Sequence, residues 1–119
     1  MNVEQLFLVA LVLTISIETA VLAAAWRLRL IRARPKPKMK EILLASALPS
    51  ALTLPYLWFV IPAFVAPANY VLIGEALVVV AEAPMLAWLL RVKLRDAAVL
   101  SLACNAASFF IGGWIFQFA

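Results

Sequence analysis

Apolar residues fill four long stretches of this chain, and most charged residues lie between the stretches rather than inside them. A helix needs about 20 apolar residues to cross a bilayer. The pattern therefore predicts membrane-spanning helices over residues 5–26, 41–65, 70–90 and 97–118. The segments 27–40 and 91–96 are predicted loops. The expected fold is an all-α integral membrane protein, a bundle of four transmembrane helices forming a single domain, residues 1–119.

The second stretch is interrupted by Pro49, Pro55 and Pro62. Proline has no backbone N–H, and its ring collides with the preceding turn, so a proline inside a helix bends or breaks it. We therefore expect the second helix to be kinked. In membrane proteins such an interruption is either a passive bend or a pointer to a binding site.

Basic residues gather in the two predicted loops, and their placement predicts the orientation in the membrane. The first loop holds Arg27, Arg29, Arg32, Arg34, Lys36, Lys38 and Lys40, and the second holds Arg91, Lys93 and Arg95. Lys and Arg are enriched in cytoplasmic loops, so we expect both loops in the cytoplasm and both termini outside, in a multi-pass protein of the cell membrane. The seven basic residues of the first loop are expected to contact anionic lipid headgroups.

Composition narrows the class further. Hydrophobic residues make up 67% of the chain, whereas soluble domains have about 45–50%. The chain has no histidine and one cysteine. Histidine is the commonest metal ligand and the usual haem ligand, so we expect no bound cofactor. The loops account for the net charge of +4. Membrane lipids are therefore the expected partners, and nucleic acid is not.

Three carboxylates, Glu18, Glu75 and Glu82, interrupt the apolar stretches. A charge inside a membrane costs several kcal/mol, so an intramembrane acid is by default a functional-site hypothesis. Glu18, Glu82, Ser50 and Asn105 lie at similar sequence distances from the basic loops, which places all four about 15 Å inside the membrane. We predict that these four residues bind a substrate or ion. Glu75 lies further out and is the predicted relay or gate.

Polar and small residues also recur at helical spacing on the second and fourth helices, at Ser46, Ser50 and Thr53 and at Ser101, Asn105, Ser108 and Gly112. Such residues usually serve close helix packing in membranes. No Lys or Arg lies within a predicted span. The acids must therefore be neutralised by protonation, by a shared cation bound to Glu18 and Glu82, or by a basic residue of a partner subunit. The identity of any metal is left open.

A weak internal repeat relates the two central acids, because Glu18–Leu30 aligns without gaps with Glu82–Leu94. The first and third helices run in the same direction, so a duplicated two-helix hairpin would bring Glu18 and Glu82 to equivalent positions.

The leading functional hypothesis is a proton- or cation-coupled transporter, or a component of a channel. The alternative is a non-catalytic structural or assembly subunit of a larger membrane complex. A membrane enzyme that acts on lipid is the least favoured, because a chain without histidine has no Ser–His or Cys–His pair. We expect self-association as a homo-oligomer with all copies oriented alike, or incorporation into a larger complex.

Overall fold

The computed structural model describes residues 2–28, 37–61, 64–65 and 67–116. Its helices are α1 (Val3–Arg27), α2 (Met39–Pro55), the π-helical turn η1 (Tyr56–Val60), α3 (Pro67–Leu90) and α4 (Leu94–Phe116). These described residues contain four helices long and apolar enough to cross a membrane, as predicted; the second combines α2 and η1. Arg29, Arg32, Arg34 and Lys36, which were predicted to contact lipid, lie outside the described residues.

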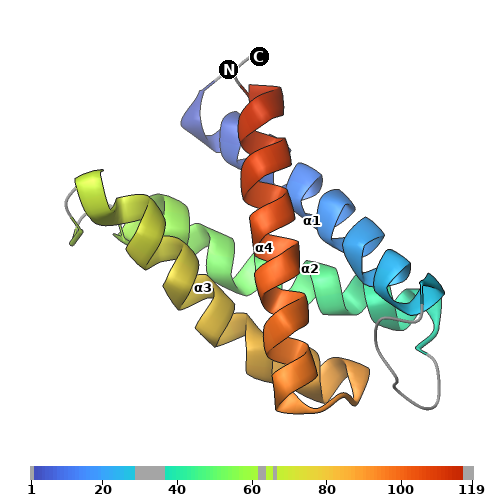
Figure 1. The fold of residues 1–119 in the computed structure, drawn as a ribbon. Coiled ribbons are helices and arrows are strands. Elements are labelled where there is room, and N and C mark those ends of the chain that lie inside the picture. The colour runs from blue at the N-terminus through green and yellow to red at the C-terminus, as the bar shows by residue number, and fades with distance from the viewer. Residues whose placement is uncertain (1, 29–36, 62–63, 66, 117–119) are drawn as a thin grey trace.

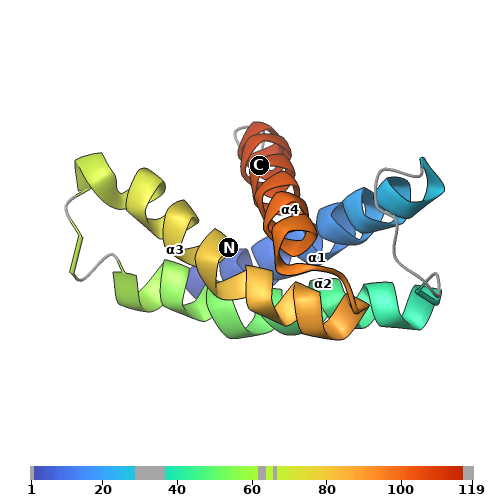
Figure 2. The same ribbon diagram turned by 60° about the horizontal axis from the view of Figure 1, so that its bottom comes forward.

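Each long helix packs mainly against two others. α1 packs against α2 and α4, and α3 packs against the same two helices. α1 and α3 therefore lie on opposite sides of the bundle, with α2 and α4 between them (Figure 1). The helices cross at wide angles rather than running parallel (Figure 2). The first residues of α1 and the last residues of α4 lie at the same end of the molecule (Figure 1).

Local sequence signals fix the helix ends. At the start of α1, the side chain of Asn2 accepts a hydrogen bond from the backbone N–H of Gln5 at 2.8 Å, and the Gln5 side chain accepts one from the Asn2 N–H at 3.2 Å. This reciprocal capping satisfies two N–H groups that have no partner inside the helix. α3 begins at Pro67, because proline lacks an N–H and its fixed φ suits the first helical position. The approximate start predicted from the sequence, Tyr70, lies in the first turn of this helix.

The prolines of the second span lie where its hydrogen bonding changes. Pro49 and Pro55 are inside α2, and the chain passes directly from Pro55 into η1. In η1 the N–H of Ile61 bonds to the carbonyl of Tyr56, five residues back. A π-turn of this kind inserts an extra residue into the helix and often occurs at functional sites. The predicted bend of the whole helix stays a prediction.

η1 and the first turns of α3 meet through side chains. The Leu57 carbonyl would receive its π-helical bond from position 62, but Pro62 has no N–H to donate. The hydroxyl of Tyr70 on α3 donates to that carbonyl instead. Close approach also depends on Gly74, since a Cβ at this position would lie 2.7 Å from Cδ1 of Leu57.

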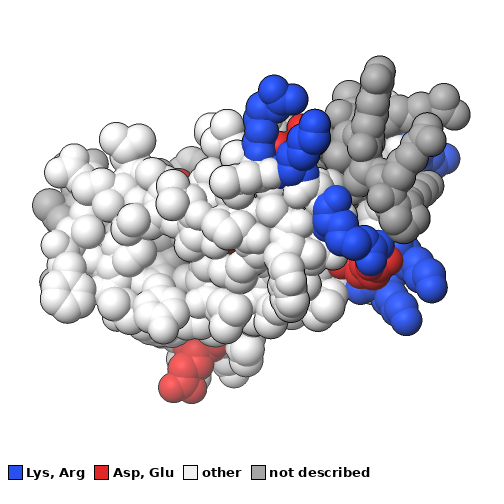
Figure 3. Space-filling view, turned by 90° about the horizontal axis from the view of Figure 1, so that it is seen from below, with Lys and Arg blue, Asp and Glu red and all other residues white. Residues whose placement is uncertain are grey.

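The apolar core occupies only one half of the bundle. It consists of Leu22, Ala25, Trp26, Ile42, Ala45, Leu86, Leu90, Ala97, Leu100 and Cys104. These residues come from the last turns of α1 and α3 and from the first half of α2 and α4. The core therefore lies beside the basic loops, where exposed Lys and Arg side chains cover that end of the molecule (Figure 3).

An ion pair and a strained residue join α3 to its neighbours at this end. A guanidinium nitrogen of Arg91 lies 3.1 Å from Oε2 of Glu41, at the start of α2. Arg91 has a φ of 56°, and the N–H of Val92 bonds to the carbonyl of Ala87 at 3.2 Å. This left-handed position after a helix is usually occupied by glycine.

Arg91 therefore provides a test of backbone strain against ion pairing. A side chain in the left-handed region costs about 1 kcal/mol, and an exposed ion pair contributes less than about 1 kcal/mol. Both Arg91→Gly and Arg91→Ala remove the ion pair, but only the glycine relieves the strain. We expect Arg91→Gly to be more stable than Arg91→Ala by about 1 kcal/mol, measured by thermal unfolding in detergent. Equal stability of the two variants would contradict the left-handed conformation.

Candidate functional site

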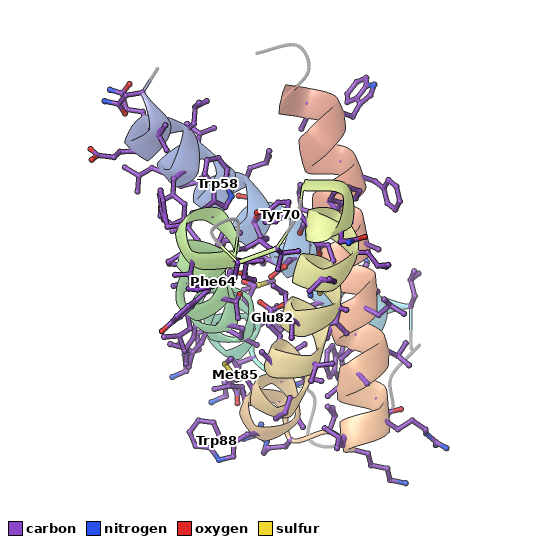
Figure 4. The ribbon with its side chains drawn as sticks, turned by 90° about the vertical axis from the view of Figure 1, so that its left-hand side faces the viewer. Trp58, Phe64, Tyr70, Glu82, Met85 and Trp88 are labelled. Carbon is purple, nitrogen blue, oxygen red and sulfur yellow. The ribbon has the colours of Figure 1, made fainter. Side chains whose placement is uncertain are left out.

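Glu18 on α1 and Glu82 on α3 are the two carboxylates at the centre of the bundle. Each residue is only 3% exposed. Figure 4 shows Glu82 pointing into the space between the helices, with Tyr70 nearer the end that bears the termini and Trp88 at the opposite end. Both carboxylates line the same cavity. The structure thus brings together two acids that are far apart in the sequence.

Glu18 is held by two serine hydroxyls from the neighbouring helices. Oγ of Ser50 on α2 donates to Oε2 of Glu18 at 2.7 Å. Oγ of Ser108 on α4 lies 3.5 Å from Oε1. A third group, the thiol of Cys104, lies 3.9 Å from the backbone carbonyl of Glu18 and does not touch the carboxylate. The carboxylate is therefore surrounded by neutral donors.

Glu82 is held in the same way by one residue from each of the same two helices. Oγ1 of Thr53 on α2 lies 2.9 Å from Oε2 of Glu82. Nδ2 of Asn105 on α4 donates to Oε1 at 2.7 Å. Each of the four carboxylate oxygens of the two acids consequently has a polar neighbour, as buried polar atoms require.

The four partners form a regular pattern on α2 and α4. Ser50 and Thr53 are three residues apart, as are Asn105 and Ser108, and this spacing places two side chains on one helix face. α2 and α4 therefore each contact both acids. The structure brings together all four of the residues predicted to bind a substrate or ion; that role itself stays a prediction.

Thr53 and Ser108 were missed as site residues. Both belong to the polar stripes visible in the sequence, which is the signal that could have identified them. They were interpreted as packing residues because hydroxyls in membrane helices usually have that role.

A second layer of hydrogen bonds fixes the partners themselves. Nδ2 of Asn105 also donates to the carbonyl of Ser101 at 2.8 Å, and Oγ of Ser101 donates to the carbonyl of Val79 on α3 at 3.0 Å. Oγ1 of Thr53 lies 2.8 Å from the carbonyl of Pro49. The partners of Glu82 are thus held by backbone carbonyls, which can only accept hydrogen bonds.

The cavity beside the acids has a volume of about 230 Å³ and extends to one side of them only. From Glu18 and Glu82 it runs past Leu57 and Tyr70 towards Gly113, which is the end that bears the termini (Figures 1 and 4). On the other side of the acids lies the apolar core. The acids therefore lie at the floor of a cavity whose base is closed by packed apolar side chains.

Glu75 lies on α3, two turns before Glu82, and is half-buried. It lines the glutamate cavity and also a second, apolar groove of about 500 Å³ between α3 and α4. Asn105 and Phe109 line both spaces as well. This position between two spaces is compatible with the predicted role of a relay or gate, which stays a prediction.

No basic side chain of the described residues lies against the buried acids. The ion pair between Arg91 and Glu41 is at the end of the bundle, and the cavity lining contains neither Lys nor Arg. Within residues 2–28, 37–61, 64–65 and 67–116 there is also no group of three or more His, Cys, Asp or Glu side chains that could hold a metal ion. A cation at this site would meet two carboxylates and neutral oxygen atoms.

Asn105 should contribute measurably to stability. Replacing it by leucine leaves Oε1 of Glu82 without its donor, and a buried group without its partner costs about 1–3 kcal/mol. We expect Asn105→Leu to lower the free energy of unfolding in detergent by about that amount. Ala103→Leu, on the exposed face of the same helix, is the matched control and should have little effect.

A double-mutant cycle isolates the contact. If Asn105 acts through Glu82, the loss caused by Asn105→Leu becomes smaller when Glu82 is already leucine. Strictly additive effects of the two substitutions would contradict a direct interaction.

Comparison with known proteins gives no relative from which a role could be transferred. The chain matches no protein-family model, no curated protein and no solved structure. Function therefore has to be argued from the chemistry of the site.

Proposed function

We propose that this protein binds a proton or a cation at the Glu18–Glu82 pair and couples its occupancy to transport across a membrane. The observation that carries this proposal is the burial of two carboxylates in one cavity, where the hydrogen-bond partners among the described residues are all neutral. Hydroxyls and amides stabilise charge but do not cancel it. A proton or a cation is then the species that lowers the negative charge of the pair.

Electrostatics makes occupancy and structure depend on each other. Two like charges close together in a poorly polarisable interior repel strongly, and an uncompensated buried charge is costly. If the bound ion or proton leaves, the two carboxylates have to separate, become hydrated or bind another ion or proton. α2 and α4 each contact both acids, so such a change is transmitted to all four helices.

The uneven packing of the bundle supports transport rather than static binding. The acids are reached through a cavity on one side and are closed off by the apolar core on the other. In alternating access, a central site opens first to one side and then to the other as parts of the bundle rock against each other. The proposal requires a second state of the bundle. In that state the half that contains the apolar core opens, and the half that contains the cavity closes.

The orientation completes the proposal. The basic end would face the cytoplasm and the end with both termini the outside, since positively charged loops are retained inside. The cavity would then open towards the outside, and Glu75 would lie on the entry route.

The alternative of an assembly subunit requires a partner's Lys or Arg to reach the acids. Both acids are 3% exposed and have their hydrogen bonds supplied within the chain. A partner side chain would have to enter through the cavity. Purification in mild detergent tests this alternative, which requires a stoichiometric foreign subunit.

Neutralising either acid should abolish coupled transport. We expect Glu18→Gln and Glu82→Gln each to lower pH- or cation-dependent flux into proteoliposomes by about tenfold or more, because each variant removes one carboxylate from the pair. Glu4→Gln is the matched control, since Glu4 is an exposed residue in the first turn of α1. Unchanged flux in both site variants would refute the proposal.

Labelling of single cysteines checks the orientation. The background is Cys104→Ala, which removes the one native cysteine. We expect Asn2→Cys to react with a membrane-impermeant maleimide in intact cells, and Lys93→Cys to react only after permeabilisation. Labelling of both positions in intact cells would contradict the proposed topology.

A further inference from the structure

We infer that the glutamate pair carries a single proton, that this proton is on Oε2 of Glu82, and that Thr53 and Asn105 are the positioning residues that keep it there while Glu18 stays ionised. The biological role of this proton rests on the proposed function. The geometry behind it is independent of transport.

Asn105 determines which oxygen of Glu82 is the acceptor. Its Nδ2 atom lies 2.8 Å from the Ser101 carbonyl and 2.7 Å from Oε1 of Glu82. A carbonyl can only accept, so the amide nitrogen, with its two hydrogens, has to face it. The second hydrogen of that nitrogen then points to Oε1. Oε1 is therefore the accepting oxygen, and any proton on this carboxyl group is on Oε2.

Thr53 provides an acceptor for that proton. Its hydroxyl has one hydrogen but two oxygen atoms within hydrogen-bond distance. These are the Pro49 carbonyl oxygen at 2.8 Å and Oε2 of Glu82 at 2.9 Å. An ionised Glu82 would compete with Pro49 for the single hydrogen. A protonated Glu82 donates from Oε2 to Oγ1 of Thr53, and Thr53 donates to Pro49. The protonated form thus makes both hydrogen bonds fully, and the ionised form makes only one.

Glu18 has the opposite surroundings. Ser50 and Ser108 have hydroxyls directed at its two carboxylate oxygens, at 2.7 and 3.5 Å. Neither hydroxyl has a second hydrogen bond to any residue that the structure describes. Both hydrogens are thus free to point at Glu18, and donors of this kind stabilise a carboxylate. A proton on Oε2 of Glu18 would leave the hydrogen of Ser50 without its acceptor, and a proton on Oε1 would have only the Ser108 hydroxyl, 3.5 Å away, to donate to.

The other titratable groups near the pair do not reverse this assignment. α3 contributes Tyr70 and Glu75 to the same cavity, and α4 contributes Cys104, which faces the Glu18 backbone. The cavity lining from α1 and α2 has no titratable side chain besides Glu18. The Tyr70 hydroxyl is already bonded to the Leu57 carbonyl. Glu18 remains as the negative charge that a cation entering the cavity would meet.

Infrared spectroscopy of the full chain in lipid bilayers tests the assignment, because a protonated carboxyl group has a C=O band that a carboxylate lacks. The background is Glu75→Gln, which removes the third acid of the cavity. We expect one protonated-carboxyl band at neutral pH, and its loss in Glu82→Gln. Absence of the band before Glu82 is replaced, or its persistence in Glu82→Gln, would overturn the inference.

Two charge-neutral variants on adjacent turns of α2 locate the proton. Thr53→Val removes the acceptor of the Glu82 proton and should shift the band to higher frequency, whereas Ser50→Ala should leave it in place. Thr53→Ser keeps the hydroxyl and should restore the original band, which separates the hydrogen bond from general loss of packing. A shift in Ser50→Ala but not in Thr53→Val would place the proton on Glu18. These bands are read without flux, so a failed transport assay and a failed assignment are distinguishable.

Discussion

Burial of two carboxylates, with no basic partner among the described residues, is the constraint on which the rest of this structure depends. Each acid needs neutral donors, because the described residues that line the cavity include no cationic side chain. α2 and α4 supply these donors in pairs, Ser50 with Thr53 and Asn105 with Ser108. The positions of four helices are thereby tied to two carboxyl groups. A change in the charge of either group has to be felt by the helices on both sides of it.

The division of the bundle into two halves follows from where the apolar side chains are placed. Residues such as Leu22, Leu90 and Leu100 pack together beside the basic loops. On the other side of the acids, small residues such as Ala10 and Gly113 line a cavity instead. Packed apolar contacts hold the first half together, so the cavity half is the part that can rearrange at lower cost.

The fold and much of the site were predictable from particular residues. Four apolar stretches predicted four helices, and counting residues inward from the basic loops brought Glu18 together with Glu82. Thr53 and Ser108 could not be assigned, because a hydroxyl at helical spacing indicates packing as well as it indicates binding.

The contact between Tyr70 and Leu57 was beyond prediction for a different reason. It depends on a π-turn, which changes the backbone carbonyl that is left without a helical hydrogen bond. Sequence periodicity does not reveal such a shift by one residue. The sequence also does not show which helices pack against each other. A polar stripe shows that one face of a helix is polar, but it does not identify the helix on the opposite side.

Prolines and hydroxyls lie near one another in the helices around the acids. Pro49 precedes Ser50, and Pro84 follows Glu82 by two residues. Each proline removes an N–H from its helix, and in a membrane the carbonyl left behind has to find another donor. Ser101 donates to the carbonyl of Val79, next to the one that Pro84 leaves without its helical donor.

Thr53 connects the backbone of α2 to the site itself. Its hydroxyl reaches both the Pro49 carbonyl and the Glu82 carboxyl group, and it has one hydrogen to share between them. The hydrogen bonding of the helix and the charge of the carboxyl group are therefore not independent. When Glu82 loses its proton, the hydroxyl is drawn from the helix to the acid, and the Pro49 carbonyl keeps only its helical backbone donor. Loss of one proton thereby weakens α2 at the place where the chain already contains two prolines.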